Sequence, residues 1–263
     1  MRATVLLALT AAVASTFFVA SSPATAAFSS GPVRITGGTL EDDSAAESGW
    51  MATIVTPAKP CSATLIAPSW VLTAGECFSG DVPGAAPGSV AGPDDVVRAA
   101  GQTRKVTWAS HRGYLTLARL DRPIQSAYYP PLAQTDPVAG ARTYMYGAGT
   151  GCVMCRQVGR YRSAPLTVIQ NDYWNLYYGS TLLSASPVGT FTLGDFGGAQ
   201  MQDGVLAGVL VGSGETQYNT APTNVISYKV APARSWILQT KAANPPPGTI
   251  VTVPTCPVFV CGK

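Results

Sequence analysis

The chain has 263 residues, of which 46% are hydrophobic and only 12% charged, and it contains a single histidine, His111. This apolar content excludes an intrinsically disordered chain, because enough apolar surface is available to build a core. The net charge of +3 without a basic run argues against nucleic acid as a partner, and one histidine excludes HExxH zinc sites and other centres that need two imidazoles from one chain. We expect no metal and no cofactor.

Residues 1–26 are predicted to form a secretory signal peptide. Arg2 precedes an uncharged apolar stretch from Thr4 to Ala20, and a proline and small residues follow it. An uncleaved membrane anchor is the alternative, but the proline and the small residues before Ala27 favour cleavage. We therefore expect a secreted, extracellular protein that does not stay bound to a membrane.

Short apolar runs separated by Gly, Pro, Ser and Asn fill most of the mature chain. Many short strands with regular turn signals are typical of an all-β barrel or sandwich. The clearest runs cover residues 51–55, 63–66, 70–73, 114–120, 144–146 and 205–211. One helix is predicted over 231–243, because Pro232 suits a first turn and a run of prolines after Asn244 ends it. Residues 244–263 then read as a proline-rich linker and a small tail.

Six cysteines fall into three pairs that are close in the sequence. An exported chain meets an oxidising compartment, so three short-loop disulfides are the simplest interpretation, although other connectivities are open. The pairs are Cys61 with Cys77, Cys152 with Cys155, and Cys256 with Cys261. The Cys152-Val-Met-Cys155 segment has the spacing of a redox motif or half a zinc site, which is the alternative for that pair.

Six segments occur in an order that carries a family resemblance. They are Arg34-Ile35-Thr36-Gly37-Gly38 with Gly49-Trp50-Met51-Ala52, Cys61 to Cys77 ending in Thr73-Ala74-Gly75-Glu76-Cys77, Leu117 to Ile124, Tyr146-Gly147-Ala148-Gly149, Gly194-Asp195-Phe196-Gly197-Gly198, and Tyr228 to Val230 with Trp236-Ile237. Together they resemble the trypsin/chymotrypsin family of serine proteases from Ile35 to about Ala243. The resemblance implies two antiparallel β-barrels of the chymotrypsin type with a C-terminal helix over 35–243, and a short propeptide over 27–34.

All three residues of the family's catalytic triad are replaced in this sequence. By the resemblance, Glu76 stands where the family has its histidine, Phe196 where it has its nucleophilic serine, and Tyr114, or Leu115 beside it, where it has its aspartate. Acyl transfer in this family needs a hydroxyl nucleophile, an imidazole base and a carboxylate that orients the imidazole. Phe196 has no nucleophilic atom, so Glu76 has no hydroxyl to deprotonate. His111 resembles a surface-loop histidine of the family and is not expected to act as a substitute base.

Other positions follow from the same resemblance. Ile35, freed by cleavage after Arg34, and Asp195 match the buried ammonium-carboxylate pair that orders the family's pocket. Gly194 matches the glycine that lines the oxyanion hole. Thr190 replaces the aspartate that gives trypsins their specificity, and Val211 replaces the serine beside the buried aspartate. The family's specificity strand is matched by Gly212 to Gly214, which is suited to pairing with an extended peptide.

The segment from Tyr173 to Tyr178 contains four aromatic residues. On a surface such a cluster would indicate a contact with a protein or a glycan, but we expect it to be buried, because aromatic side chains dominate cores as well.

The expected function is therefore that of a monomeric, secreted serine-protease homologue without peptidase activity, which binds an extended peptide or protein, for instance as a decoy for protease inhibitors. The alternative is a weakly active hydrolase that uses Glu76 or other non-standard residues.

Overall fold

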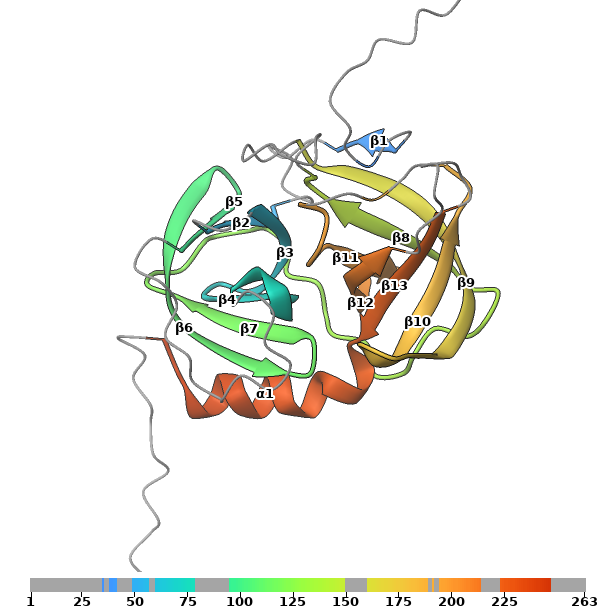
Figure 1. Ribbon diagram of the computed structural model, residues 1–263. Helices are drawn as coiled ribbons and strands as arrows, with labels where there is room; N and C mark the ends of the chain where they lie inside the picture. Colours follow the sequence, from blue (N-terminus) through green and yellow to red (C-terminus); the bar gives the residue numbers. More distant parts are fainter. Residues whose placement is uncertain are drawn as a thin grey trace, which may run out of the picture. The chain divides into compact units, whose positions relative to one another are not determined.

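The computed structural model describes residues 35, 38–41, 49–56, 60–78, 95–149, 160–188, 191, 194–213 and 223–246 (Figure 1). Strands make up most of the described chain. The predicted signal peptide (1–26), the propeptide (27–34) and residues 247–263 of the predicted tail lie outside the described residues, so these predictions remain untested.

The first barrel is closed by six antiparallel strands in the order β2-β3-β4-β7-β6-β5. They are β2 (Met51–Val55), β3 (Pro60–Ala67), β4 (Trp70–Ala74), β5 (Val96–Ala99), β6 (Gln102–Arg112) and β7 (Leu115–Leu120). All five residues of β4 are buried. The apolar runs predicted in the first half of the chain therefore correspond to β2, β3, β4 and β7.

The second barrel follows the order β9-β10-β13-β12-β11-β8 and closes where β8 pairs with β9; the short β1 (Thr39–Leu40) adds to β9 at its edge. Its strands are β8 (Arg142–Gly147), β9 (Arg162–Asn175), β10 (Gly179–Ser186), β11 (Ala199–Gln202), β12 (Val205–Ser213) and β13 (Thr223–Lys229). The expectation of two antiparallel barrels of the chymotrypsin type is confirmed.

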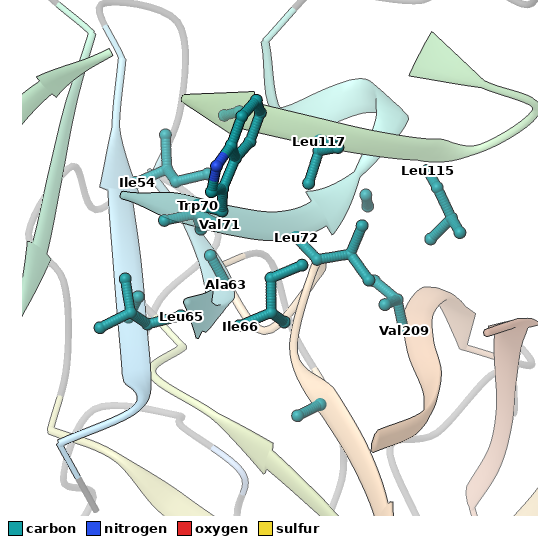
Figure 2. Close-up of a cluster of buried hydrophobic side chains, with 14 of the residues drawn as sticks. Ile54, Ala63, Leu65, Ile66, Trp70, Val71, Leu72, Leu115, Leu117 and Val209 are labelled. Carbon is teal, nitrogen blue, oxygen red and sulfur yellow. The ribbon is translucent and has the colours of Figure 1, made fainter. Parts of the chain in front are cut away.

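Strand β12 links the two hydrophobic cores. Val209 and Val211 belong to a large buried cluster that fills the first barrel and the seam between the barrels, whereas Leu210 belongs to a smaller cluster inside the second barrel. This split follows from the alternation of side chains along a strand. Figure 2 shows Val209 of β12 beside Leu72 of β4 in the first barrel. Burial on both faces explains why the 205–211 segment reads as a continuous apolar run.

The predicted C-terminal helix is present, but its first turn has a different geometry. Residues Ala231–Ala233 form a 3₁₀ turn, and the α-helix α1 runs from Arg234 to Ala243. Pro232 lies in the 3₁₀ turn, where its missing N–H is tolerated. Ile237 is fully buried and joins the large cluster, so this helix packs on the barrels through Ile237.

Candidate functional site

The three positions that the resemblance assigns to the triad lie close to one another. Glu76 belongs to a 3₁₀ turn, Gly75–Cys77, directly after β4, and Tyr114 lies in the turn between β6 and β7. The Gly75 N–H donates to the Tyr114 carbonyl at 2.7 Å, which brings these two segments together. Phe196 lies in the loop before β11, and its carbonyl oxygen is 3.9 Å from the Sγ of Cys77. Residues from three separate segments thus meet at one site.

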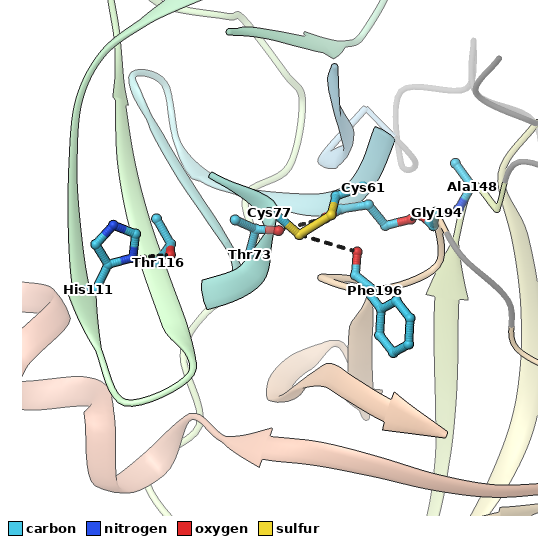
Figure 3. The surroundings of a disulfide bond; sticks show 9 residues. Cys61, Thr73, Cys77, His111, Thr116, Ala148, Gly194 and Phe196 are labelled. Atoms are coloured by element: carbon cyan, nitrogen blue, oxygen red, sulfur yellow. Dashed lines mark hydrogen bonds between the residues drawn. A yellow bond between two sulfur atoms is a disulfide. The ribbon is translucent and has the colours of Figure 1, made fainter. Parts of the chain in front are cut away.

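The predicted disulfide between Cys61 and Cys77 is present. It joins β3 to the turn that carries Glu76, and it lies beside Phe196 (Figure 3). The other four cysteines, Cys152, Cys155, Cys256 and Cys261, lie outside the described residues, so their pairing stays a prediction.

Tyrosine rings occupy the side of the site where Tyr114 lies. The ring of Tyr178 meets that of Tyr114 edge to face, with centroids 4.7 Å apart and planes at 83°. A Cβ added at Gly212 would lie 3.0 Å from the Tyr178 ring, so this ring also covers the specificity strand. We call Glu76, Tyr114 and Tyr178 the cleft cluster. The aromatic content of the 173–178 segment was noted in the sequence, but nothing in it placed Tyr178 beside Tyr114.

Burial raises the pKa of the Tyr178 phenol above its ordinary value, and the nearby Glu76 carboxylate and the phenols of Tyr114 and Tyr177 raise it further. A phenol so placed stays protonated and neutral at physiological pH. The cleft cluster therefore presents two aromatic rings and one carboxylate, and the Tyr178 phenol is not activated as a nucleophile.

The Phe196 side chain is half-buried and packs against both hydrophobic clusters. In Figure 3 its ring points away from the disulfide. The smaller cluster that it contacts includes Phe191, Leu210 and Val225. The ring thus contributes apolar packing at the position where the family places a nucleophile.

The segment Gly194–Gly198, here called the glycine loop, needs its glycines for close packing. Gly194 and Gly197 have positive φ values of 94° and 84°. A Cβ at Gly197 would lie 2.1 Å from both the Ser62 carbonyl oxygen and the Thr73 Oγ1, a distance that no side chain can occupy. This loop can therefore form only with glycine at position 197.

Ser62 fastens the glycine loop to the first barrel. Its N–H donates to the Phe196 carbonyl at 2.8 Å, and its hydroxyl donates to the Gly194 carbonyl at 2.7 Å and accepts the Ala148 N–H at 2.8 Å. Ser62 was not predicted from the sequence, because its partners lie 86 and 132 residues away and no motif connects them.

Ile35 and Asp195, the predicted activation pair, are both fully buried. The Ile35 side chain packs in the smaller cluster, and the Asp195 carboxylate accepts the Gly149 N–H at 2.8 Å. A Cβ at Gly147 or Gly149 would lie within 3 Å of that carboxylate, so the Asp195 carboxylate packs directly against the backbone of these two glycines. The pairing of an Ile35 amine with Asp195 stays a prediction, because Arg34 lies outside the described residues.

The remaining specificity positions are only partly described. Val211 is buried, and Gly212 pairs with Ile226 of β13. On its other edge β12 pairs with β11 no further than Val209. Thr190 and Gly214 lie outside the described residues.

His111 lies on a strand, so its expected place in a surface loop is wrong. It is half-buried near the end of β6, directly opposite Thr116 of β7, and its Nδ1 is 2.6 Å from the Thr116 hydroxyl. Burial lowers the pKa of the imidazole. This hydrogen bond ties the imidazole to its own hairpin.

Three residues of the aromatic segment are exposed, which corrects the expectation that the segment is buried. Trp174, Leu176 and Tyr177 are 74%, 86% and 72% exposed. They lie where β9 ends and β10 begins, beyond the reach of either core. We call these three residues the hairpin tip. Within the segment, Tyr178 is half-buried because its ring turns back toward Tyr114.

Among the described residues, no group of three or more His, Cys, Asp or Glu side chains is arranged to hold a metal ion. Within the same residues, no helix has the length and apolar character that crossing a membrane requires.

Comparison with known proteins agrees with this architecture. Human heparin binding protein superposes with a TM-score of 0.62 at 21% identity, covering 81% of this chain and 99% of that one. Neuropsin, a serine protease of mouse brain, gives 0.59 at 17% identity, covering 77% and 98%. The scabies mite inactivated protease paralogue S-D1 gives 0.60 at 15% identity, covering 79% and 97%. These likenesses show the fold.

No curated protein matches the sequence. The sequence model of the family described as Trypsin, however, matches residues 36–237, which is most of the chain and includes both barrels. The chain therefore belongs to the trypsin family.

Proposed function

We propose that this protein is a secreted, catalytically inactive member of the trypsin family that acts by binding. The observation that carries the proposal is the identity and packing of the residues at the triad positions. Phe196 supplies packing in place of a nucleophile, and Tyr114 contacts Tyr178 in place of orienting an imidazole. At the position of the family's histidine stands the Glu76 carboxylate, and the serine hydroxyl that the family's base activates is replaced by the Phe196 ring.

Two features support secretion. The first 26 residues have the charge pattern and the apolar stretch of a signal peptide. The Cys61–Cys77 disulfide is of a kind that persists in oxidising compartments and is rare in the cytosol.

The hairpin tip is the surface best suited to a partner. Trp and Tyr are the residues most enriched at the energetic centres of protein interfaces, and Trp174 and Tyr177 are both largely exposed here. A hydrogen bond and an ion pair stabilise the strands of this hairpin, since the Ser180 hydroxyl donates to the Asp172 carboxylate and the Lys229 Nζ lies 3.5 Å from the same carboxylate. This tip lies beside the cleft cluster. An extended peptide or protein is favoured as the partner because, within the described residues, the edge of β12 next to Gly212 has no partner strand beyond Val209.

The absence of covalent chemistry can be tested with a fluorophosphonate probe. The mature protein, intact and cleaved after Arg34, is incubated with the probe and analysed by intact-mass spectrometry beside an active trypsin. We expect no mass shift in either form, because no activated hydroxyl lies in the site. Stoichiometric labelling of a residue in the cleft cluster or the glycine loop would overturn the proposal.

Binding at the hairpin tip can be tested with a photoreactive amino acid in place of Trp174, in protein returned to the culture medium of its producer. The matched control carries the same group in place of Val138, which is 67% exposed and lies elsewhere on the surface. We expect one discrete cross-linked species from position 174 and none from position 138. Equal cross-linking from both positions, or none from position 174, would contradict a partner at this surface.

A further inference from the structure

A second hollow of the molecule lies along the seam between the barrels and shares no residue with the cleft cluster or the glycine loop. It has a volume of about 840 Å³, within the range of about 300–1,000 Å³ that is usual for ligand sites. We call it the seam groove. Its described lining residues are Trp50, Ala127, Tyr128, Arg142, Tyr144, Tyr146, Met201, Asp203 and Gly204.

The alternation of β8 brings two tyrosines and an arginine into the seam groove. Arg142, Tyr144 and Tyr146 are at every second position of β8 and share one face, whereas Thr143 and Met145 between them are buried. Strand β11 is the neighbour of β8 (Figure 1), and its Met201 lies directly opposite Tyr144.

The floor of the groove is rigid and apolar. Trp50 and Met201 are only 6% and 5% exposed, and the Trp50 ring meets the Tyr146 ring edge to face with centroids 5.2 Å apart. Tyr144, by contrast, is 49% exposed, so its ring forms an accessible wall. Burial raises the pKa of Tyr146, with smaller contributions from Glu41 and Tyr144, so its hydroxyl remains a donor at physiological pH.

The rim carries one charge of each sign. Asp203 and Gly204 form the two-residue turn between β11 and β12, with φ values of 48° and 78° that are typical of a type I′ hairpin turn. The Tyr128 hydroxyl donates to the Gly204 carbonyl, which holds this turn against the groove wall. Arg142 supplies the positive charge.

The ligand must satisfy all these groups together. Arg142 offers only donors and the Asp203 carboxylate only acceptors, so a ligand between them needs both acceptors and donors. Its net charge should be close to zero, because the two rim charges cancel. It must also offer flat apolar faces to the aromatic rings.

We propose that the seam groove binds a neutral oligosaccharide. Each pyranose ring has a face of C–H bonds that packs on an aromatic ring, and hydroxyls around its edge that both donate and accept hydrogen bonds. A proline-rich peptide also packs on aromatic grooves, but proline has no N–H, so its backbone offers Asp203 no hydrogen-bond donor. This site is independent of the binding role proposed for the hairpin tip.

Binding is tested by calorimetric titration of the mature protein with cellohexaose, chitohexaose and maltohexaose, and with decaproline as the competing class. We expect at least one of the three oligosaccharides to bind with a Kd below about 1 mM and decaproline not to bind. Tyr144→Ala should weaken that binding by roughly tenfold or more, because the accessible ring is lost. Asp203→Asn should weaken it as well, and asparagine tolerates the positive φ at this turn, so the variant keeps the fold.

Two controls separate the seam groove from general surface effects. Tyr144→Phe keeps the aromatic ring and should retain most of the affinity. Tyr177→Ala removes an exposed ring from the hairpin tip and should leave sugar binding unchanged. The proposal is overturned if no oligosaccharide binds, if decaproline binds in the groove instead, or if Asp203→Asn and Tyr144→Ala bind as the unaltered protein does. If Tyr144→Ala fails to fold, the affinity of Asp203→Asn for the oligosaccharide alone decides whether the proposal stands.

Discussion

The glycine loop and the cleft cluster meet at the Cys61–Cys77 disulfide, yet different demands hold their residues in place. In the glycine loop, the close approach at Gly197 and the hydrogen bonds of Ser62 hold the loop against the first barrel, a role that does not depend on catalysis. In the cleft cluster, Glu76 and Tyr114 stand where, by the resemblance, the family carries residues that only its chemistry needs. A match to the family's glycine-rich motif therefore reports the fold, whereas activity depends on side chains that the fold does not require.

The largest expected effect breaks the glycine loop. Gly197→Ala would place a Cβ 2.1 Å from Ser62 and Thr73 in a backbone with φ of 84°. Strain and overpacking together should lower the free energy of unfolding by roughly 3 kcal/mol or more, measured by urea denaturation.

Gly101→Ala is the matched control for this loop. Gly101 also has a positive φ, 67°, but a Cβ there meets no atom within 4 Å. The Gly101→Ala substitution should lower the free energy of unfolding by only about 1–2 kcal/mol, from backbone strain alone. Equal losses in the two variants would show that close packing at Gly197 is unimportant.

A smaller effect is expected from Ser62→Ala, which leaves the Ala148 N–H without its acceptor and the Gly194 carbonyl without its donor. Unsatisfied buried groups cost about 1–3 kcal/mol, which the midpoint of urea unfolding should report. Thr107→Ala removes an exposed hydroxyl bonded to the Arg119 carbonyl and should change stability by less than about 0.5 kcal/mol. A neutral Ser62→Ala would contradict the role of Ser62 as the fastening between the barrels.

In the cleft cluster, Glu76→Gln should change the titration of Tyr178 and little else. Removing the carboxylate removes one cause of the raised pKa, so the phenol should ionise at lower pH, although burial keeps its pKa above the ordinary value of about 10. Ultraviolet absorbance at alkaline pH measures this, and Tyr178→Phe identifies the component that belongs to Tyr178. An unchanged titration curve would contradict the proximity of the Glu76 carboxylate to the Tyr178 phenol.

The same shift has a consequence for stability. The folded state favours the neutral phenol, so its contribution to stability is fully present below the unfolded pKa of about 10 and is lost as the pH rises through the folded pKa. When the pH is raised through the folded pKa of Tyr178, the Tyr178→Phe variant should therefore lose less stability than the unaltered protein does.

The smallest effect is expected for the titration of His111. Its imidazole NMR signal can be assigned directly, because it is the only histidine in the chain. Burial lowers its pKa below the usual 6.5, so the neutral imidazole is favoured in the folded state. The stability it contributes is present above pH 6.5 and is lost as the pH falls through the folded pKa. A proton NMR titration should give a midpoint below 6.5, and a midpoint above that value would contradict the burial seen in β6.

The sequence predicted those parts of the molecule that are specified locally. Apolar runs located β2, β4 and β12, and closeness in the sequence paired Cys61 with Cys77. The segments that resemble the family supplied the two barrels. Each of these features depends on residues within a short stretch or on a motif of known order.

The parts that the sequence did not predict depend on contacts between distant segments. Ser62 bonds to residues 86 and 132 positions away, and Tyr178 reaches Tyr114 from a different barrel. The burial expected for Trp174 was wrong, because composition does not tell whether a hairpin ends under another layer or beyond it. The seam groove likewise forms between distant segments, where the Trp50 ring packs against Tyr146 of β8.

We propose that the residues at the triad positions perform no hydrolysis, which can be measured as turnover of a panel of peptide thioesters by the protein cleaved after Arg34. The rate should equal that of buffer, and Glu76→Ala or Phe196→Ala should leave it unchanged. A rate above buffer that either substitution abolishes would contradict it.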